Sequence, residues 1–350
     1  MANLKDEIEL RKAYKNMNES FEQVLIFHVG ESAGFFSEYN SMILAMLYCL
    51  QHRIQFKLYS MLYCLQHRIQ FKLYSKDANF GYEQGWGDFF EPFCKEENSY
   101  WHHYINMRPI ANWCTILKKK KIGFLKWKIK KSLYGFIAIV WKISHPKVLL
   151  TQDVWAKIYS KDQMHCMYHI PELNLNGNMM QACEMLVRIT WNYRKDINDK
   201  LDDYIKSLNL DNGYISTQIR AGDKYIEHDL LPISVYVNYL KRYPKCKSVF
   251  VLTDDYSIIE QLKSLYPQWN WCTLCEDRER GYIHSEFKQN SRIGKKKQLI
   301  KFFTSMEIIH RSDLFLGTVT SNPSVFCSLR DSDKTLFVDY DQSVFSFMLS

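Results

Sequence analysis

The sequence predicts an α/β protein whose C-terminal part is a doubly wound parallel sheet. Beyond residue 213, short apolar runs that suit buried strands alternate with segments of helical periodicity, the order that places helices on both faces of a parallel sheet. Near the start, the apolar run Val24–Val29 ends at a glycine and precedes a helical segment, which is the opening of another α/β unit. The 350 residues suffice for two domains or one large one, and we expect two, residues 1–208 and 209–345.

The expected elements follow from the periodicity of apolar residues. In the first domain we expect a strand at Val24–Val29, a helix from Glu38, and a loop at 79–94 whose aromatic rings cap a core or line a cleft. A long helix is expected over Met179–Leu208, because apolar residues recur there at steps of three or four. The second domain is expected to contain, in order, a strand at Tyr214–Ile219, a helix at Ser234–Arg242, a strand at Ser248–Leu252, helices at Ser257–Leu265 and Leu299–His310, and a strand at Leu314–Leu316.

A tandem repeat interrupts the first domain. Met46–Ser60 reads MLYCLQHRIQFKLYS, and Met61–Ser75 repeats it letter for letter. Two copies do not make a solenoid, so we interpret them as a duplication of one helix-then-strand unit. We expect one copy to be structurally redundant, with the strand IQFKLYS supplied by either.

Composition excludes several protein classes. Apolar residues make up 47% of the chain, with 13 Gly and 8 Pro, which excludes collagen-like and low-complexity sequences. The net charge of +8 favours phosphate-bearing or anionic partners. The ten cysteines are scattered, as expected of reduced thiols, and no basic-then-apolar leader follows Met1, so we expect a cytoplasmic protein.

The segment Lys118–Lys131 holds eight lysines interleaved with apolar and aromatic residues, and the apolar run Leu133–Val140 follows it. One interpretation is a solvated basic helix face. The other is a peripheral contact with an anionic surface, and we favour the membrane over nucleic acid because an apolar stretch adjoins the lysines. At the inner membrane this would place the protein on its cytoplasmic face.

Polar residues follow three of the expected strands of the second domain. Because ligands of doubly wound sheets bind beyond the carboxyl ends of the strands, these segments are the candidate site. Arg220 suits a diphosphate, since guanidinium binds phosphate oxygens bidentately. The three segments are Gln218–Lys224, Thr253–Asp255 and Gly317–Pro323, the last opening a helix N-terminus that suits phosphate.

Each segment also has a purely structural interpretation. An Arg-x-Gly-Asp sequence is often a turn, and adjacent aspartates after a strand often cap a helix. Other candidates are weaker still. The lone pair Cys272 and Cys275, and the group His165, Cys166 and His169, lack a full set of zinc ligands. His102 and His103 are more typical of a surface or core than of a catalytic site.

The three segments resemble motifs of the α1,6-fucosyltransferases, which include core and nodulation enzymes, and of the related protein O-fucosyltransferases. Gln218–Lys224 is similar to their phosphate-binding motif, FVLTDD at Phe250–Asp255 to the second motif, and SDLFLGTVTSN at Ser312–Asn322 to the third. The resemblance implies two Rossmann-like domains of GT-B-like architecture, the C-terminal one binding GDP-fucose. Because the anchor, stem and SH3-like domain of animal enzymes are missing, we expect a bacterial-type protein.

The resemblance also implies roles for single residues. Arg220 would bind the β-phosphate, with Asp223 and Lys224 shaping the site and Gln218 beside them. Asp254 and Asp255 would lie beside the fucose or acceptor, and Glu227 or Asp254 would be the base. The remaining donor-side positions are Tyr236, Ser305, Thr320, Ser321 and Asn322.

Three residues depart from the family pattern. Gln218 stands where the family has histidine, Ala221 where core enzymes have a second arginine, and Ser305 where a guanine-reading aspartate is expected. Two hypotheses follow. The chain is an inverting fucosyltransferase that acts on a surface glycan or lipid-linked oligosaccharide, or it is a catalytically impaired nucleotide- or glycan-binding protein of the same fold.

We expect no metal and no cofactor besides the donor. In the transferase hypothesis, negative charge develops on the β-phosphate as the glycosidic bond breaks, and fixed donors such as Arg220 and the loop at Ser321 stabilise it. A carboxylate removes the proton of the acceptor hydroxyl. Asp339 and Asp341 form an Asp-x-Asp that imitates a metal site, but they follow a terminal strand.

Overall fold

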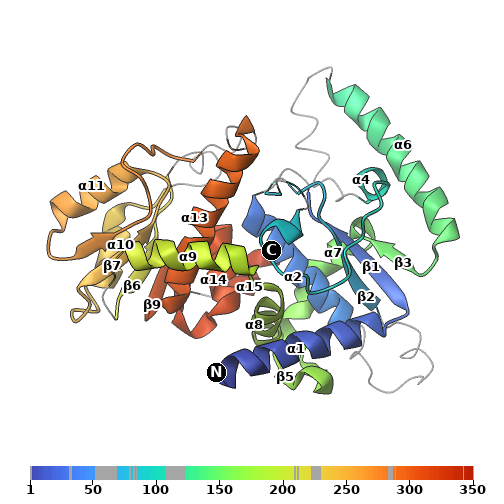
Figure 1. Cartoon of the computed structure of the whole chain (residues 1–350), viewed down its shortest axis with the longest axis horizontal. Helices are drawn as coiled ribbons and strands as arrows, with labels where there is room; N and C mark the ends of the chain where they lie inside the picture. The colour runs from blue at the N-terminus through green and yellow to red at the C-terminus, as the bar shows by residue number, and fades with distance from the viewer. Residues whose placement is uncertain are drawn as a thin grey trace. The chain divides into compact units, whose positions relative to one another are not determined.

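The computed structural model describes residues 2–30, 34–51, 69–78, 80–81, 83, 85–106, 123–208, 210, 213–221, 230–282, 287, 289–341 and 343–349. The chain divides into two compact units. The first comprises Met1–Ala33 and Ser41–Thr190, and the second comprises Gly34–Asn40 and Trp191–Ser350 (Figure 1).

The first unit is built on three parallel strands in the order β2-β1-β3. These are β1 (Gln23–His28), β2 (Ile69–Tyr74) and β3 (Val148–Leu150), with Leu25 of β1 opposite both Phe71 and Leu149. The N-terminal helix α1 (Ala2–Glu19) covers β2, where the side chain of Asn18 donates to the carbonyl of Phe71 at 2.9 Å and accepts from its N–H at 2.6 Å. This amide therefore takes the place of a neighbouring strand, which satisfies backbone groups that burial would otherwise leave unpaired.

Helices and a small antiparallel pair surround this sheet. The pair is β4 (Tyr168–Ile170) with β5 (Leu175–Gly177). The 3-10 turns are η1 (Trp86–Asp88), η2 (Lys161–His165) and η3 (Pro171–Leu173), and the helices are α2 (Phe35–Gln51), α4 (His102–Ile105), α6 (Gly123–Ser144), α7 (Thr151–Ile158) and α8 (Met179–Thr190). In the expected loop 79–94, the rings of Trp86, Phe89, Phe90 and Phe93 are buried, so they cap a core.

The tandem repeat is shared between two elements. The first copy supplies the end of α2, up to Gln51, and the second copy supplies β2, which begins at Ile69. Residues 52–68 lie outside the described residues. The end of α2 uses the first part of the repeat, and β2 uses the second part. A single copy therefore contains both the end of α2 and all of β2.

Deletion of residues 61–75 is expected to leave the fold intact and the thermal unfolding midpoint unchanged or higher. One copy then remains, and a His-Arg pair joins α2 to β2, which is an ordinary length for such a connection. A shorter connection costs less entropy to close, about 0.6 kcal/mol for each halving of its length. Circular dichroism melts of both proteins check this. A lower midpoint after deletion would show that the longer connection stabilises the fold.

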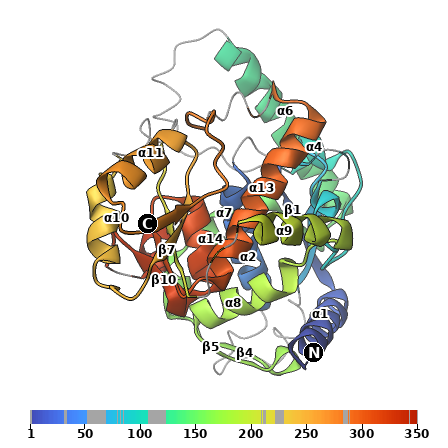
Figure 2. The ribbon, with the colours of Figure 1, turned by 60° about the vertical axis from the view of Figure 1, so that its left-hand side comes forward.

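The second unit contains a five-stranded parallel sheet in the order β10-β9-β6-β7-β8, which confirms the predicted α/β class. Its core joins Ile215, Val249, Val251 and Leu316 on the sheet to one face of α10 and α11, and both views show these helices beside β7 (Figure 2). Helix α13 contacts β6 and β7. The strands are β6 (Ile215–Gln218), β7 (Ser248–Leu252), β8 (Asn270–Cys272), β9 (Leu314–Gly317) and β10 (Thr335–Phe337); the helices are α9 (Lys195–Ser207), α10 (Ile233–Leu240), α11 (Tyr256–Leu265), α13 (Arg292–Arg311), α14 (Asn322–Arg330) and α15 (Val344–Met348), with the 3-10 turn η5 (Ser332–Lys334).

The structure differs from two of the expectations: the single helix over Met179–Leu208 and the division of the chain at residue 209. The single helix expected over Met179–Leu208 is two helices, α8 and α9, because the chain between them turns Trp191 into a cluster of rings that includes Phe303 and Phe326. Helix α9 packs on α13 of the second unit. The division expected at residue 209 is therefore found after Thr190 instead, and residues 34–40 also belong to the second unit.

Candidate functional site

The order of strands in the second unit singles out one edge of its sheet. The chain moves outward from β6 through β7 to β8 and then returns to β9 on the other side of β6. Connections therefore leave β6 and β9 in opposite directions, and a crevice at such a reversal, beyond the carboxyl ends of the strands, is where ligands of this fold class bind. Gln218 ends β6, and Gly317 ends β9. Two of the three predicted segments thus begin at the reversal.

Gln218 connects these two segments. Its side chain is 2% exposed, and its Oε1 accepts hydrogen bonds from the hydroxyls of Ser321 at 2.8 Å and Ser324 at 2.6 Å. Ser324 also packs closely against Gly317, where no side chain fits, because a Cβ there would lie 2.5 Å from the Ser324 Oγ. Gln218 therefore holds the loop after β9 in place. Its side-chain oxygen Oε1 already accepts two hydrogen bonds from within the protein.

The same loop is fastened on its other side by Asp339. One carboxylate oxygen of Asp339 accepts from the N–H of Val319 at 2.9 Å. Ser321 is the residue before α14, but its hydroxyl donates to Gln218 and does not cap the first turn of the helix. The first N–H groups of a helix lack partners within the helix, and such groups attract anions. Thr320 is half-buried, Ser321 is buried, and the side chain of Asn322 is exposed.

Asp254 positions Arg220. The two oxygens of its carboxylate accept from the backbone N–H groups of Ala221 at 2.8 Å and Tyr282 at 3.1 Å. The Nε of Arg220 lies 3.5 Å from the same carboxylate, and its guanidinium carbon lies 5.8 Å from the centre of the Tyr282 ring. The arginine side chain is 25% exposed. Asp254 therefore holds the backbone at Ala221 and Tyr282 and the guanidinium of Arg220 together.

The neighbouring Asp255 has a different task. Its carboxylate accepts from the N–H of Ser257 at 2.9 Å, which makes it the cap of α11. The Thr253 hydroxyl is hydrogen-bonded to the backbone of Asp255 as well. Of the two predicted aspartates, Asp254 lies at the carboxyl edge with Arg220, and Asp255 stabilises the start of a helix.

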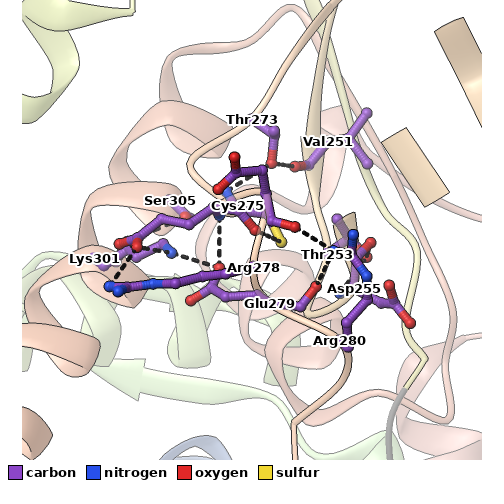
Figure 3. A network of polar contacts seen from close by, with 12 residues as sticks. Val251, Thr253, Asp255, Thr273, Cys275, Arg278, Glu279, Arg280, Lys301 and Ser305 are labelled. Carbon is purple, nitrogen blue, oxygen red and sulfur yellow. Dashed lines mark hydrogen bonds and ion pairs between the residues drawn. The ribbon is translucent and has the colours of Figure 1, made fainter. Parts of the chain in front are cut away.

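A polar network fixes the segment that follows β8 (Figure 3). Lys301 of α13 binds Glu279 at 2.6 Å and Glu276 at 3.8 Å, while the hydroxyl of Thr273 donates to the carbonyl of Val251 at 2.8 Å. Burial acts to raise the pKa of Glu279, but the hydrogen bonds from Lys301 and from the backbone of Glu276, together with the charge of Lys301, lower the pKa. The segment is thereby held beside β7, and it continues to Tyr282, which contacts Arg220.

The remaining predicted residues fall into two groups. Ser305 is buried on α13, where its hydroxyl donates to the carbonyl of Lys301 at 3.1 Å, and Tyr236 packs in the core beneath the sheet. Burial raises the pKa of Tyr236. Asp223, Lys224 and Glu227 lie outside the described residues.

A second polar cluster lies in the first unit, where β1 and β2 end. The same oxygen of Asp77 lies 2.9 Å from the Nε2 of His28 and 2.9 Å from the Nδ1 of His103. Burial acts to raise the pKa of Asp77, but these hydrogen bonds lower it. His102 is buried against Tyr74, and burial lowers its pKa to about 4. Asp77 therefore links His103 of α4 to His28 of β1. Of the two adjacent histidines, His102 lies in the core and His103 is half exposed.

Metal ligands are not gathered in the part of the chain that the structure describes. No group of three or more His, Cys, Asp or Glu residues there could hold a metal ion. In the segment after β8, the Cys275 thiol lies in the network of Figure 3, and burial raises its pKa to about 12.

Tyr282 and Ser324 were not predicted at this site, and Asp339 was considered only as part of an Asp-x-Asp that imitates a metal site. Tyr282, Ser324 and Asp339 contact Arg220, Gln218 and Val319 respectively. Asp339 had a signal, because it directly follows the apolar run of β10, as Asp254 follows β7. Tyr282 had none, since its place depends on how Lys301 holds the preceding segment.

No model of a known protein family matches the sequence, and no curated protein matches it. Among solved structures, the chain is similar to NodZ α-1,6-fucosyltransferase co-crystallised with GDP, at 12% identity and a TM-score of 0.46, over 87% of this chain and 91% of that one. It is also similar to fucosyltransferase NodZ from Bradyrhizobium, at 10% identity and a TM-score of 0.47, over 87% and 92% of the two chains. POFUT1 in complex with GDP-fucose follows at 11% identity and a TM-score of 0.42, over 90% and 97%.

Proposed function

We propose that this chain transfers L-fucose from GDP-β-L-fucose to a hydroxyl of a glycan, with inversion to an α linkage such as α1,6. The observation that carries the proposal is Arg220, fixed by Asp254 at the reversal of strand order, in a segment that resembles the phosphate-binding motif of the α1,6-fucosyltransferases. A cation held in place at this edge suits the diphosphate of a sugar nucleotide, because its position costs no rearrangement when charge develops.

The proposed mechanism assigns each residue a task that its contacts allow. Arg220 and the first N–H groups of α14 stabilise the negative charge that develops on the β-phosphate as the bond to fucose breaks. Asp254 positions Arg220, since both carboxylate oxygens already accept backbone hydrogen bonds. Glu227 is then the proposed base that takes the proton from the acceptor hydroxyl. These groups neutralise the diphosphate without a divalent metal, and metal independence is part of the proposal.

A specific observation favours the alternative of an impaired binding protein. Gln218 and Ser305, two positions where the sequence departs from the family pattern, make hydrogen bonds within the protein fold itself. In this alternative the site holds a nucleotide or glycan without transferring fucose. The acceptor in the transferase proposal is a surface glycan or lipid-linked oligosaccharide, which the enzyme would meet at the cytoplasmic face of the inner membrane.

A panel of nucleotides tests the two functions against each other. Melting temperature and GDP release are measured with GDP-fucose, GDP-mannose, UDP-glucose and GDP, all with EDTA present. A transferase is expected to be stabilised by GDP and by GDP-fucose. Of the sugar nucleotides, only GDP-fucose is expected to release GDP slowly without an acceptor, because the groups that bind the diphosphate also stabilise the transfer of fucose to water. Stabilisation without release would support the binding protein. No response to any guanine nucleotide would overturn the donor assignment.

A further inference from the structure

Helix α6 carries a row of apolar side chains on its outer surface. Leu133, Phe136, Ile139, Val140 and Ile143 are 56%, 65%, 63%, 51% and 76% exposed. They recur at steps of three and four residues or side by side, so they share one side of the helix. Single exposed apolar residues are common, but a contiguous group of this size marks an interaction surface.

The opposite side of α6 is packed, so the helix is anchored and its apolar row faces outward. Ala138 is 5% exposed and forms a small core with Ile105 and Leu150, with Ile137 and Trp141 packed against it. The ring of Tyr134 lies 5.2 Å from that of Tyr104, in α4, and Figure 1 shows α6 beside α4. The exposed row is therefore a fixed feature of the first unit.

Charge is strongly segregated along the part of the sequence that contains this helix, although Lys142 forms an ion pair with Asp153 at 2.8 Å. Residues 98–152 contain no aspartate or glutamate, and they contain eleven of the 46 lysines and arginines of the chain. The rest of the chain carries slightly more acidic than basic residues. The positive surplus of the protein thus belongs entirely to the segment that contains α6.

We infer that the apolar row of α6 docks on an anionic lipid surface. Apolar side chains entering the acyl boundary beside a basic segment are the combination that binds interfacial helices to acidic membranes. Nucleic acid fits less well, because four of the five exposed side chains are aliphatic and offer neither charge to phosphates nor a ring for stacking on bases. No helix among the described residues is long and apolar enough to cross a membrane. The inference is independent of the donor chemistry.

Vesicle flotation tests the apolar half of the inference. The full chain is expected to float with vesicles of phosphatidylcholine and phosphatidylglycerol but not with phosphatidylcholine alone. The triple variant Phe136→Gln, Ile139→Gln, Ile143→Gln should bind the anionic vesicles at least about tenfold more weakly, which corresponds to 1.4 kcal/mol. The matched control, Leu265→Gln with Ile293→Gln, removes side chains that are 61% and 83% exposed elsewhere and should bind like the wild type.

A second variant tests the charge. Replacing Lys118–Lys121 by glutamine should weaken binding to the anionic vesicles, and added salt should weaken wild-type binding in the same way. Equal binding to neutral and anionic vesicles, no binding to either, or wild-type binding by the triple variant would overturn the inference. The thermal shift with GDP-fucose is expected to be unchanged in every variant, so a failure here is distinct from a failure of the proposed function.

Discussion

Replacing Arg220 by alanine is expected to abolish nearly all GDP release from GDP-fucose and to leave the protein folded. The guanidinium is a fixed cation aimed at a site where negative charge develops, and loss of one such donor costs about 10²–10³ in rate. The fold should survive because both carboxylate oxygens of Asp254 also accept backbone hydrogen bonds, which remain when the arginine is removed. GDP release at saturating GDP-fucose measures the loss, and a circular dichroism melt confirms folding.

A second variant tests whether the position of Arg220 matters as well as its charge, and a third serves as a control. Asp254→Asn keeps an oxygen that accepts a backbone hydrogen bond but loses the ion pair, so an intermediate loss of rate is expected. Arg311→Ala is the matched control, because Arg311 lies in the same unit and forms an exposed ion pair with Asp202 at 3.2 Å. It should release GDP at the wild-type rate. Undiminished release by the Arg220→Ala protein would refute the assignment of this residue to the diphosphate.

The sequence predicted the bounds of three strands of the second unit, β6, β7 and β9, and it missed β8, which is three residues long and begins with asparagine. Ser248–Leu252 was predicted residue for residue, and the strands that end at Gln218 and near Gly317 were placed within one or two residues. Parallel strands must align their carboxyl ends, so the meeting of the segments after β6 and β9 also followed from the pattern.

Individual roles were harder to predict because they depend on which neighbour each side chain meets. Asp254 and Asp255 are indistinguishable in sequence, yet only Asp255 can reach the first turn of α11. Gln218 was expected at the donor, but the pairing of β6 with β9 places it opposite Ser321 and Ser324.

Two errors of the sequence interpretation have a common physical origin. The break between α8 and α9 contains no glycine or proline, and apolar spacing continues through it, so periodicity alone does not detect it. Helix α1 was not predicted, because few of its side chains are buried, among them Tyr14 and Met17. In both cases the decisive contacts are long-range, and local patterns contain no information about them.

The ion pair between Glu307 of α13 and Arg330 of α14 is expected to be the largest single polar contribution to the stability of the second unit. Two hydrogen bonds join the carboxylate to the guanidinium at 2.8 and 3.0 Å, and the indole N–H of Trp191 donates to the same carboxylate at 2.8 Å. The side chains are 13% and 14% exposed. Removing one partner of such a pair leaves a charge without compensation in a poorly solvated place.

Glu307→Gln is therefore expected to lower the free energy of unfolding at pH 7 by about 3–5 kcal/mol. Urea denaturation followed by circular dichroism measures the change. The control is Glu260→Gln, because Glu260 is 58% exposed and lies 3.7 Å from Arg280. Its loss should change the free energy by less than about 1 kcal/mol, as is usual for surface ion pairs.

The pH dependence should confirm the cause. Burial acts to raise the pKa of Glu307, but the charge and hydrogen bonds of Arg330 lower it from 4.5 to about 2. A carboxyl with a lowered pKa in the folded state stabilises the protein fully above its unfolded pKa, and this contribution is lost as the pH falls from about 4.5 to about 2. The stability difference between wild type and Glu307→Gln should therefore shrink across that interval. A difference that stays constant would show that the glutamine acts by altered packing instead.

Replacing both partners by apolar residues separates the cost of a lone buried charge from the contribution of the ion pair itself. Glu307→Leu with Arg330→Met removes both buried charges at similar volume, so no uncompensated charge remains. We expect the double variant to be more stable than Glu307→Gln alone, since apolar pairs often replace buried ion pairs without loss. If the double variant were no more stable than the single one, the pair would contribute chiefly through the hydrogen bond from Trp191, which orients the ring against Phe326 at a centroid distance of 4.3 Å.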